Sequence, residues 1–442
     1  MEQFNLLNHI TNNDDYIVVW LYNIGVERYW GNEISLIKDK KENTIVNHME
    51  EMNLLLTRKQ DFMIMRKYPN AALIAELKTL SCEIPNILCP QIENEEKTIS
   101  ELVLEDEQLL NKLKIISSKY QKLYFVPYGI SYLEEKIASL CGMKLYGADS
   151  SIQKTINNKI FAHKVANYLG YKTTESRICK NIEEIRDSYA ILKKKYDKIV
   201  IKSPCSASGK GMWVINTAEK LKSICLILNR LQKFDEGYVV EGWQEKKADL
   251  NYQIYVSEKG DVNVFSIKEQ ILNETVYIGS IMPARVSSNI INECKKCGKE
   301  IGELLYKHGF YGILGIDALL TCDDQLIPII EINGRFTLST YTSFLSERYK
   351  NKIILSFYSK LRFSKLIDYT IIVNALKQEK LWLNKDGDGG FIYTAETLNS
   401  ILASGNCRAF CIVIESDEVK IRDVYRKIQM VLEKIMKNRY GN

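Results

Sequence analysis

Short apolar runs alternate with amphipathic stretches over residues 1–147. Short apolar runs predict strands, whereas apolar residues three and four apart predict helices. Strands are expected at Tyr16–Leu21, Phe62–Met65, Ile84–Leu88 and Leu123–Val126. Helices are expected at Leu73–Leu80, Ile99–Lys119 and Ser131–Cys141, with Gly142 as the C-cap of the last one. This alternation is typical of an open α/β domain.

The pattern changes near Gly147, where a second region of mixed helices and strands begins. Helices are expected at Ser150–Tyr168, Ala218–Leu231 and Asn289–His308. Strands are expected at Lys198–Ser203, Met212–Ile215, Gly237–Glu241, Leu250–Val256, Val262–Ile267 and Glu274–Ile281. Two further apolar runs around the polar turn Thr321–Gln325 predict a hairpin within Tyr311–Ser343.

The end of the chain carries the weakest pattern. It is expected to be mostly helical from Thr342 to about Gln378, with a last helix in Ser416–Lys437. Strands are expected at Gly387–Thr394 and Ala409–Glu415. The expected division is therefore residues 1–147, 148–245, 246–375 and 376–442, the last segment packing on the third.

Composition narrows the class of protein. The chain has 442 residues, 46% of them hydrophobic and 26% charged, as in soluble globular proteins of more than one domain. The net charge of +5 is small and the charges are interspersed, so nucleic acid is not an expected partner. No apolar run approaches the ~18–20 residues of a membrane span, and the N-terminus lacks a secretory pattern. Eleven scattered cysteines favour reduced thiols in a cytoplasm.

The hairpin carries the strongest candidate chemistry. Asp317 lies near the end of the first apolar run, and Glu331 and Asn333 end the second. Pairing of the two strands would bring these side chains to one edge, with Glu331 and Asn333 on the same face. Two carboxylates and an amide oxygen suit Mg²⁺, which shares its ligands with substrate phosphates. Arg335 follows with the same parity, as a fixed cation beside a phosphate site.

A loop of small residues, Lys202–Gly211, separates two strand-like runs. Its backbone N–H groups could approach phosphate oxygens closely. It lacks the spacing of a Walker A motif. Taken alone, the stretch is equally compatible with a plain flexible hairpin loop.

Two lysines and a strand end complete the candidate set. Lys159 and Lys202 could each place a compact cation on a phosphate, although most lysines are simply solvated. Val239–Trp243 ends a strand and could offer backbone groups to an adenine edge. Asp249 could then accept hydrogen bonds from ribose hydroxyls. Each feature alone also fits a strand end or a solvated acid.

Other sites are disfavoured. Cys294 and Cys297 form a lone CxxC inside an expected helix, without the second ligand pair that zinc needs. The four histidines do not cluster in sequence, and no GxSxG motif indicates a serine hydrolase.

The order of these elements resembles the ATP-grasp superfamily over roughly Gly147–Phe344. Glu331–Arg335, EINGR, is similar to the E-x-N-x-R signature of that family, with Gly334 where proline or alanine is common. The resemblance implies an α/β protein with an ATP-grasp fold, in which two α+β subdomains grip ATP. An open α/β pre-ATP-grasp domain would precede it.

The resemblance also assigns roles to residues. It implies that ATP is bound by Lys159, Lys202, Ser206, Ser208, Gly209, Gly211, Glu241, Gly242, Trp243 and Asp249. It implies that Mg²⁺, with Mn²⁺ as an alternative, is bound by Asp317, Glu331 and Asn333. Arg335 would lie beside the transferred phosphoryl group. Arg285 is the candidate for a substrate carboxylate or acyl phosphate, because its planar fork suits such groups, and a surface salt bridge is the alternative account.

The N-terminal part resembles the pre-ATP-grasp domain of pheganomycin-type peptide ligases. This similarity rests on Val26–Trp30, Asn47–Leu56 and Arg66–Ala71, together with Gln270, Tyr277–Gly279, Pro283 and Arg285. It implies a ligase that joins a small-molecule or peptide carboxylate to an amine through an acyl phosphate, releasing ADP and phosphate. Peptide natural-product biosynthesis would be the setting, and a homodimer would follow family analogy. A biotin-carboxylase-like enzyme and a non-catalytic ATP-binding module are the alternatives.

Overall fold

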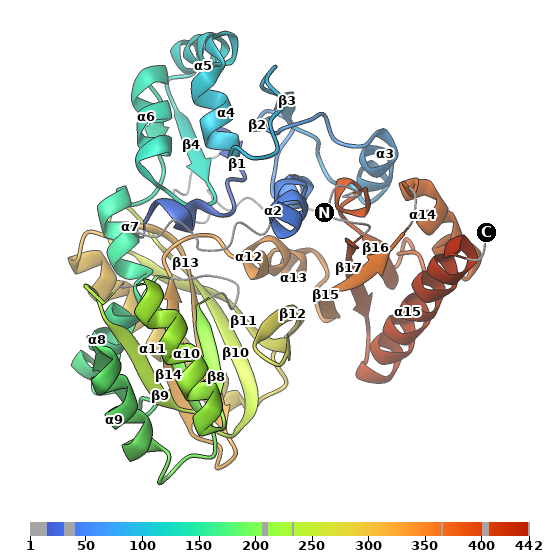
Figure 1. Ribbon diagram of the computed structural model, residues 1–442. Helices are drawn as coiled ribbons and strands as arrows, with labels where there is room; N and C mark the ends of the chain where they lie inside the picture. The colour runs from blue at the N-terminus through green and yellow to red at the C-terminus, as the bar shows by residue number, and fades with distance from the viewer. Residues whose placement is uncertain are drawn as a thin grey trace. The chain divides into compact units, whose positions relative to one another are not determined.

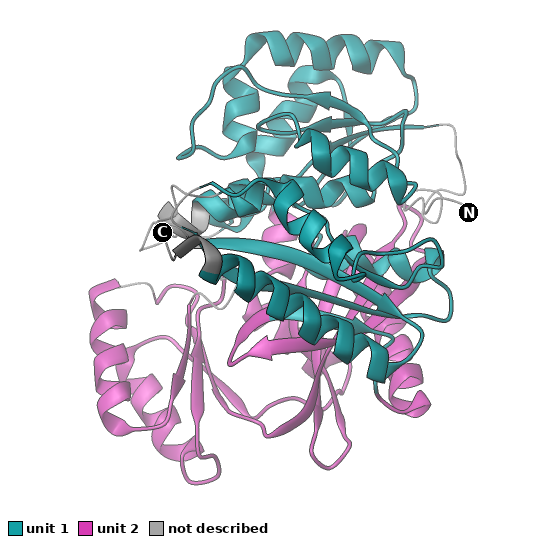
Figure 2. Ribbon diagram, turned by 90° about the vertical axis from the view of Figure 1, so that its right-hand side faces the viewer, with its two compact units in different colours: residues 1–150, 278–285, 336–442 teal, residues 151–277, 286–335 magenta. Residues whose placement is uncertain are grey.

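The chain forms two compact units. The computed structural model describes residues 16–30, 40–205, 211–231, 234–363, 366–399 and 406–440 (Figure 1). One unit contains residues 1–150, 278–285 and 336–442, and the other contains residues 151–277 and 286–335 (Figure 2). The division into four consecutive segments stays a prediction. None of the described helices is long and apolar enough to cross a membrane.

The N-terminal part of the first unit is built on a parallel five-stranded sheet of order β3-β2-β1-β4-β5. Its strands are β1 (Ile17–Leu21), β2 (Phe62–Ile64), β3 (Asn86–Leu88), β4 (Leu123–Pro127) and β5 (Lys144–Leu145). Parallel strands covered on both faces read as continuous apolar runs, which is the pattern of β1 and β4. Four of these strands agree with the sequence expectation.

Short helices surround this sheet. They are η1 (Val26–Tyr29), α2 (Lys40–Asn47), η2 (Met49–Leu55), α3 (Ala71–Thr79), α4 (Ile99–Glu105), α5 (Glu107–Lys119) and α6 (Tyr132–Cys141). The single helix expected at Ile99–Lys119 is wrong, because Asp106 has extended backbone and separates α4 from α5. The Asp106 side chain accepts a hydrogen bond from Leu109 N and thereby caps α5. The apolar positions keep their helical spacing across Asp106, so the pattern alone does not reveal the break between the two helices.

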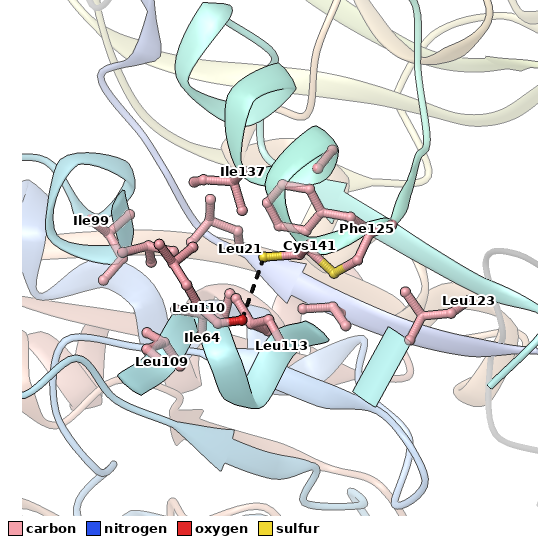
Figure 3. Close-up of a cluster of buried hydrophobic side chains, with 14 residues drawn as sticks. Leu21, Ile64, Ile99, Leu109, Leu110, Leu113, Leu123, Phe125, Ile137 and Cys141 are labelled. Carbon is pink, nitrogen blue, oxygen red and sulfur yellow. Dashed lines mark hydrogen bonds between the residues drawn. The ribbon is translucent and has the colours of Figure 1, made fainter. Parts of the chain in front are cut away.

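The core beneath α4, α5 and α6 is apolar and closely packed (Figure 3). Leu21, Ile64 and Phe125 from the strands meet Leu113 and Ile137 from the helices. All five are almost completely buried. Burial of each such side chain contributes roughly 1.5–3 kcal/mol, so this cluster stabilises the N-terminal sheet.

The C-terminal part of the first unit contains an antiparallel sheet. The strand β15 (Ile353–Arg362) pairs with β17 (Asn406–Glu415) on one side and with the end of β12 (Val276–Met282) on the other. The strand β16 (Gly389–Ile392) pairs with β17. Its helices are α12 (Leu338–Ser343), α13 (Leu345–Arg348), α14 (Tyr369–Gln378), η3 (Glu396–Leu398) and α15 (Glu418–Tyr440).

The expectation of a mostly helical stretch from Thr342 to Gln378 is wrong in its middle. Residues Ile353–Arg362 form a strand that pairs along its length with β17, from Ile353 opposite Glu415 to Arg362 opposite Asn406. Such a partner lies far away in sequence, so local periodicity does not reveal it. The strands expected near Gly387 and Ala409 are present as β16 and β17.

Segments from the two ends of the chain contact each other within the first unit. The buried Glu51 carboxylate accepts hydrogen bonds from the backbone nitrogens of Ala395 and Glu396. Lys377 on α14 pairs with Glu76 on α3 at 2.6 Å. The C-terminal segment therefore packs on the N-terminal part, in addition to its pairing with β15.

Glu50 is a buried acid beside Arg66 in this unit. Its Oε2 accepts from Arg66 N at 2.6 Å, and its Oε1 lies 3.7 Å from Arg66 Nε. Burial raises the pKa of Glu50 to about 8, although Arg66 acts in the opposite direction. Between pH 4.5 and about 8, Glu50 is therefore protonated in the folded state and ionised in the unfolded state. Stability is expected to fall as the pH rises from about 4.5 through about 8.

Glu50→Gln removes this titration. The variant is expected to be more stable than the wild type by a few kcal/mol at pH 9, because each pKa unit corresponds to roughly 1.4 kcal/mol. The gain is expected to vanish near pH 5. Urea unfolding of both proteins at pH 5, 7 and 9 measures it, and an equal difference at all three values would contradict the role of Glu50 ionisation.

The second unit contains a small antiparallel sheet of order β6-β9-β7-β8. Its strands are β6 (Ser176–Cys179), β7 (Ile199–Lys202), β8 (Met212–Ile215) and β9 (Tyr238–Gly242). The helices α9 (Ile182–Leu192) and α10 (Ala218–Leu231) pack on it through a core that includes Ile185, Ile201 and Leu228. All elements except β6 and α9 were expected from the sequence.

A larger sheet of the same unit has the strand order β14-β13-β10-β11. Its strands are β10 (Lys246–Val256), β11 (Val262–Asn273), β13 (Gly312–Thr321) and β14 (Leu326–Asn333). The long helix α11 (Ser288–Lys307) packs on β10 and β11. The hairpin expected around Thr321–Gln325 is present as β13 and β14.

The single helix expected at Ser150–Tyr168 is wrong. It is divided into α7 (Ser150–Ile156) and α8 (Lys159–Tyr168). Asn158 has extended backbone, and its Oδ1 accepts from Ile160 N as the N-cap of α8. This break places Lys159 in the first turn of a new helix, where the backbone N–H groups and the helix dipole favour anions.

Candidate active site

The hairpin brings the expected metal ligands together. Asp317 on β13 and Glu331 on β14 are direct cross-strand partners, and Gly315 is the partner of Asn333. Partners on neighbouring strands point to the same face, and Asn333 has the parity of Glu331. Asn333 Nδ2 donates to Asp317 Oδ2 at 3.1 Å. The sequence-based juxtaposition is therefore present, and the metal-binding role remains a prediction.

Asp317 is an unusual carboxylate. It accepts hydrogen bonds from Asn251 Nδ2 at 2.8 Å and from Gln270 Nε2 at 2.9 Å, besides that from Asn333. Burial and, to a lesser extent, the neighbouring Glu331 carboxylate raise its pKa to about 6, although the amide donors act in the opposite direction. Two carboxylates this close repel each other, so a bound cation would stabilise the pair.

Lys159 lies against this carboxylate pair. Its Nζ is 3.0 Å from Glu331 Oε1, and the lysine side chain is buried. Its backbone nitrogen donates to Pro204 O at 2.9 Å, which fixes the start of α8 next to the small-residue loop. A buried cation, a carboxylate pair and a phosphate-type loop therefore lie close together in the second unit.

Lys202 forms a second buried ion pair. It ends β7, and its Nζ pairs with the Glu241 carboxylate on the adjacent strand β9. Glu241 also accepts from Thr174 Oγ1 at 3.1 Å and lies 3.5 Å from His163 Nε2. Burial would raise the pKa of Glu241, but Lys202 and His163 outweigh it and hold the pKa at about 2. The Glu241 side chain is thus paired with Lys202, and its expected place at the adenine edge remains a prediction.

Gly242 is the last residue of β9, and Trp243 begins the short linker from β9 to β10. Gly242 N donates to Glu175 O and Trp243 N donates to Lys198 O, at 3.0 and 2.9 Å. A backbone donor for a purine would therefore come from beyond Trp243.

Asp249 lies on the strand that follows the linker. Its carboxylate pairs with Lys246 at 2.7 Å, and the Lys246 ammonium also lies over the Trp243 ring. The three side chains form one cluster at the start of β10. The carboxylate expected to contact ribose is therefore held by a neighbouring cation.

The small-residue loop is described only at its two ends. Ser203 N donates to Gly211 O at 2.8 Å, and Gly211 has a positive φ of 74° that favours glycine. The expected phosphate contacts at Ser206, Ser208 and Gly209 lie outside the described residues.

The two expected catalytic arginines belong to different units. Arg335 lies two residues after Asn333 and is buried, and its backbone nitrogen donates to Asn333 O at 2.8 Å. Arg285 belongs to the other unit. The roles of both arginines remain predictions.

Gly334, the departure from the family signature, has a physical reason. A Cβ atom there would lie 2.7 Å from Ile156 Cγ2, and Gly334 N donates to Asn157 Oδ1 at 3.1 Å. The break between α7 and α8 thus packs directly against the end of β14, the strand that carries two of the expected metal ligands. Alanine would collide with this break, and proline would also remove the hydrogen-bond donor.

Gly334→Ala is therefore expected to destabilise the protein by about 1–3 kcal/mol, the usual effect of overpacking. Chemical denaturation measures the change. Gly170→Ala is a poor control because of its positive φ. Ser346→Ala is the control, because it removes only a partly buried hydrogen bond from α13 to Ser343 O and is expected to change stability by less than about 1 kcal/mol. Equal effects of the two substitutions would contradict the packing explanation.

Sequence reasoning missed several residues of the site. Asn251 contacts Asp317, whereas His163 and Thr174 both contact Glu241. None of the three residues is part of a recognisable motif. Asn251 and Gln253 are polar positions that alternate with apolar ones on a long strand, and His163 lies one helical turn after Lys159. These were the available signals. The contacts themselves depend on long-range pairing.

Lys268 was also missed. It lies on β11 opposite Asn251, in the same cross-strand row as Asp317 and Glu331. Its side chain is fully buried, and burial lowers its pKa well below the usual lysine range. A third buried lysine, after Lys159 and Lys202, thus shares the face that carries the expected metal ligands.

The residues present fit a nucleotide and its divalent cation. No group of three or more His, Cys, Asp or Glu side chains suited to a metal occurs among the described residues. The candidate set instead has two carboxylates and one amide, which matches the few protein ligands that Mg²⁺ takes when phosphates supply the others. The buried Lys159 and Lys202 would provide the positive charge that those phosphates need.

Comparison with known proteins identifies the domain. The family model described as the ATP-grasp domain matches residues 164–340, which include Lys202, Glu241 and the whole β13–β14 hairpin. Residues 164–340 are an ATP-grasp domain. The ATP-grasp fold class and the relationship to ATP-grasp ligases expected from the sequence are confirmed. Lys159 lies just before the matched range.

Relatives extend the similarity beyond that domain. The chain is 27% identical over 330 residues to the [butirosin acyl-carrier protein]–L-glutamate ligase of Niallia circulans, covering 73% of each chain. It is 24% identical over 135 residues to N5-carboxyaminoimidazole ribonucleotide synthase of Bacillus subtilis, covering 29% of this chain and 33% of that protein. The expected enzyme class, an ATP-grasp ligase, is confirmed by the family and the first relative.

Solved structures show the same fold. An ADP complex of N5-carboxyaminoimidazole ribonucleotide synthetase matches with a TM-score of 0.56 and 11% identity, covering 96% of this chain and 98% of that one. The biotin carboxylase domain of Hydrogenobacter thermophilus 2-oxoglutarate carboxylase, a dimer with MgADP and bicarbonate, matches with a TM-score of 0.52 and 13% identity, covering 90% and 86%. At such identities the likeness concerns the fold alone.

Proposed function

We propose that this ATP-grasp ligase joins a carboxylate to an amine through an acyl phosphate, with release of ADP and phosphate. The observation that carries the proposal is the contact of the buried Lys159 with Glu331, which lies beside Asp317 on the hairpin, both carboxylates being partly buried. Positive charge next to two repelling carboxylates suits a metal-bound polyphosphate. No nucleophilic side chain is needed, because the substrates react with each other.

In the first step, a substrate carboxylate oxygen attacks the γ-phosphorus of ATP, and the bond to ADP breaks. In the second step, the amine attacks the acyl carbon, loses a proton and expels phosphate. Mg²⁺, when bound by Asp317, Glu331 and Asn333, would neutralise charge that develops on the phosphates. Lys159 and Lys202 hold the phosphate chain, and Arg335 stabilises the transferred group. Catalysis therefore depends on positioning and charge.

The substrate class is proposed from the relative in Niallia circulans, whose name states an L-glutamate and an acyl-carrier protein. An amino acid is accordingly our candidate for one substrate, and an amine or carboxylate on a small molecule, peptide or carrier is the candidate for the other. Peptide natural-product biosynthesis is the proposed setting. The eleven cysteines are an odd number scattered over a long chain, which favours a reducing compartment such as the cytoplasm. A homodimer is proposed by analogy with the dimeric biotin carboxylase domain.

The test is a screen for condensed products. The full chain is incubated with MgATP, the twenty amino acids and a panel of acids and amines, and mass spectrometry detects new amides. ADP and phosphate are expected to form only when an acid is present, with amide formation requiring the amine. Production of AMP and pyrophosphate would exclude the proposal.

A biotin-carboxylase-like activity is the second candidate, because that domain is among the structural neighbours. It predicts ATP cleavage that depends on bicarbonate and biotin without any amine. ATP binding with no turnover over the whole panel would instead favour a non-catalytic ATP-binding module.

A further inference from the structure

Asp317 lies in an amide cradle formed by Asn251, Gln270 and Asn333. Asn251 Nδ2 and Gln270 Nε2 both donate to Asp317 Oδ1, at 2.8 and 2.9 Å. Asn333 Nδ2 donates to the other oxygen, Oδ2, at 3.1 Å. An ionised carboxylate only accepts hydrogen bonds, so each amide must turn its nitrogen toward it.

The two oxygens of Asp317 are unequally occupied. Each carboxylate oxygen offers about two lone pairs to donors. The donors from Asn251 and Gln270 use both on Oδ1, whereas Oδ2 receives Asn333 alone among the donors in the described part of the chain. A cation therefore has access to one Asp317 oxygen, not to both.

The orientation of the Asn251 amide is fixed by a second hydrogen bond. Asn251 is the cross-strand partner of Asp317 on β13, and its Oδ1 accepts from Gln253 Nε2 at 2.6 Å. Asn251 and Gln253 are both buried. Because the Asn251 oxygen is already bound, its amide cannot reverse, and its nitrogen stays directed at Asp317.

The number of available oxygens matters for the choice of metal. Mg²⁺ requires near-ideal octahedral geometry, in which a carboxylate contributes one oxygen, whereas Ca²⁺ has flexible geometry and accepts carboxylates through both oxygens. We propose that Asn251 and Gln270 are positioning residues that make Asp317 a one-oxygen ligand, and that they thereby select Mg²⁺ over Ca²⁺ in the nucleotide complex. This inference rests on the proposed function, since it takes Asp317 as a ligand of the metal–nucleotide site.

Metal binding to the full chain tests the inference without requiring turnover. Isothermal titration calorimetry measures Mg²⁺ and Ca²⁺ affinity in the presence of a non-hydrolysable ATP analogue, for the wild type, Asn251→Leu and Gln270→Met. Loss of such supporting groups commonly weakens metal binding by about 10–100-fold. The Mg²⁺ affinity is expected to fall by about this factor and the Ca²⁺ affinity far less, so that the preference for Mg²⁺ shrinks.

The variants are chosen so that one of them folds. Asn251 is buried and Gln270 is only half-buried, so Gln270→Met decides the matter alone if Asn251→Leu does not fold. Gln325→Met is the matched control, because Gln325 is exposed in the turn at the opposite end of the hairpin and pairs with Lys172. It is expected to leave both affinities unchanged.

Two failures are distinguishable. A folded Gln270→Met with an unchanged ratio of Mg²⁺ to Ca²⁺ affinity would overturn the cradle inference. The proposed function would survive that result if Glu331→Gln still weakened both metals. If Asp317→Asn and Glu331→Gln both left metal binding to the nucleotide complex intact, the metal site and the inference built on it would fall together.

Discussion

Glu331→Gln is expected to lower kcat by roughly 10²–10³-fold at saturating ATP. Loss of one electrostatic contact to the transition state commonly costs about 3–4 kcal/mol, and each 1.36 kcal/mol is a factor of about ten. Glutamine has nearly the size of glutamate and can still accept from Lys159, so the buried contact at 3.0 Å need not be lost. The missing element is the negative charge beside Asp317. Steady-state ADP release at several Mg²⁺ concentrations measures the effect.

Asp324→Asn is the control for this substitution. Asp324 lies in the turn of the same hairpin and forms an exposed pair with Lys247. Exposed pairs contribute little, so kcat is expected to stay within about twofold of the wild type. High Mg²⁺ is expected to restore part of the activity of Glu331→Gln. If Glu331→Gln kept kcat near the wild-type value at every Mg²⁺ concentration, Glu331 would not be a metal ligand.

The hairpin was predictable because its signals are local. Two apolar runs and the polar turn at Thr321–Gln325 define β13 and β14, and strand parity then places Asp317 and Glu331 on one face. The same holds for β7 and β9, whose apolar runs end in Lys202 and Glu241. What the pattern could not show is that these two residues bind each other.

The remainder depends on partners that are distant in sequence. The strand β15 is defined by pairing with β17, which follows it by some fifty residues and comes after a helix. Asn251 on β10 and Gln270 on β11 contact Asp317 on β13. The spacing of residues along the sequence does not predict contacts between these three strands. The break before Lys159 did carry a local signal, the asparagine that caps α8, but the apolar periodicity continues across it.

Lys202→Met is expected to lower the free energy of unfolding by roughly 3–5 kcal/mol, the usual effect of removing one partner of a buried ion pair. Glu241 would remain buried, with His163 and Thr174 as its remaining partners among the described residues. Lys202 ends a strand of the small sheet, so the effect is expected in the unfolding of the second unit. Urea unfolding measures the loss, and calorimetry with an ATP analogue measures nucleotide affinity.

The double variant Lys202→Met/Glu241→Gln separates stability from binding. Removing both charges is expected to recover most of the stability, because no uncompensated charge stays buried. Nucleotide affinity is expected to remain low, since the cation proposed to bind a phosphate is still missing. Lys195→Met is the control, because its pair with Glu175 is exposed and is expected to contribute no more than about 1 kcal/mol. If affinity returned together with stability, Lys202 would serve only to neutralise Glu241, and the phosphate contact would have to be reassigned to Lys159.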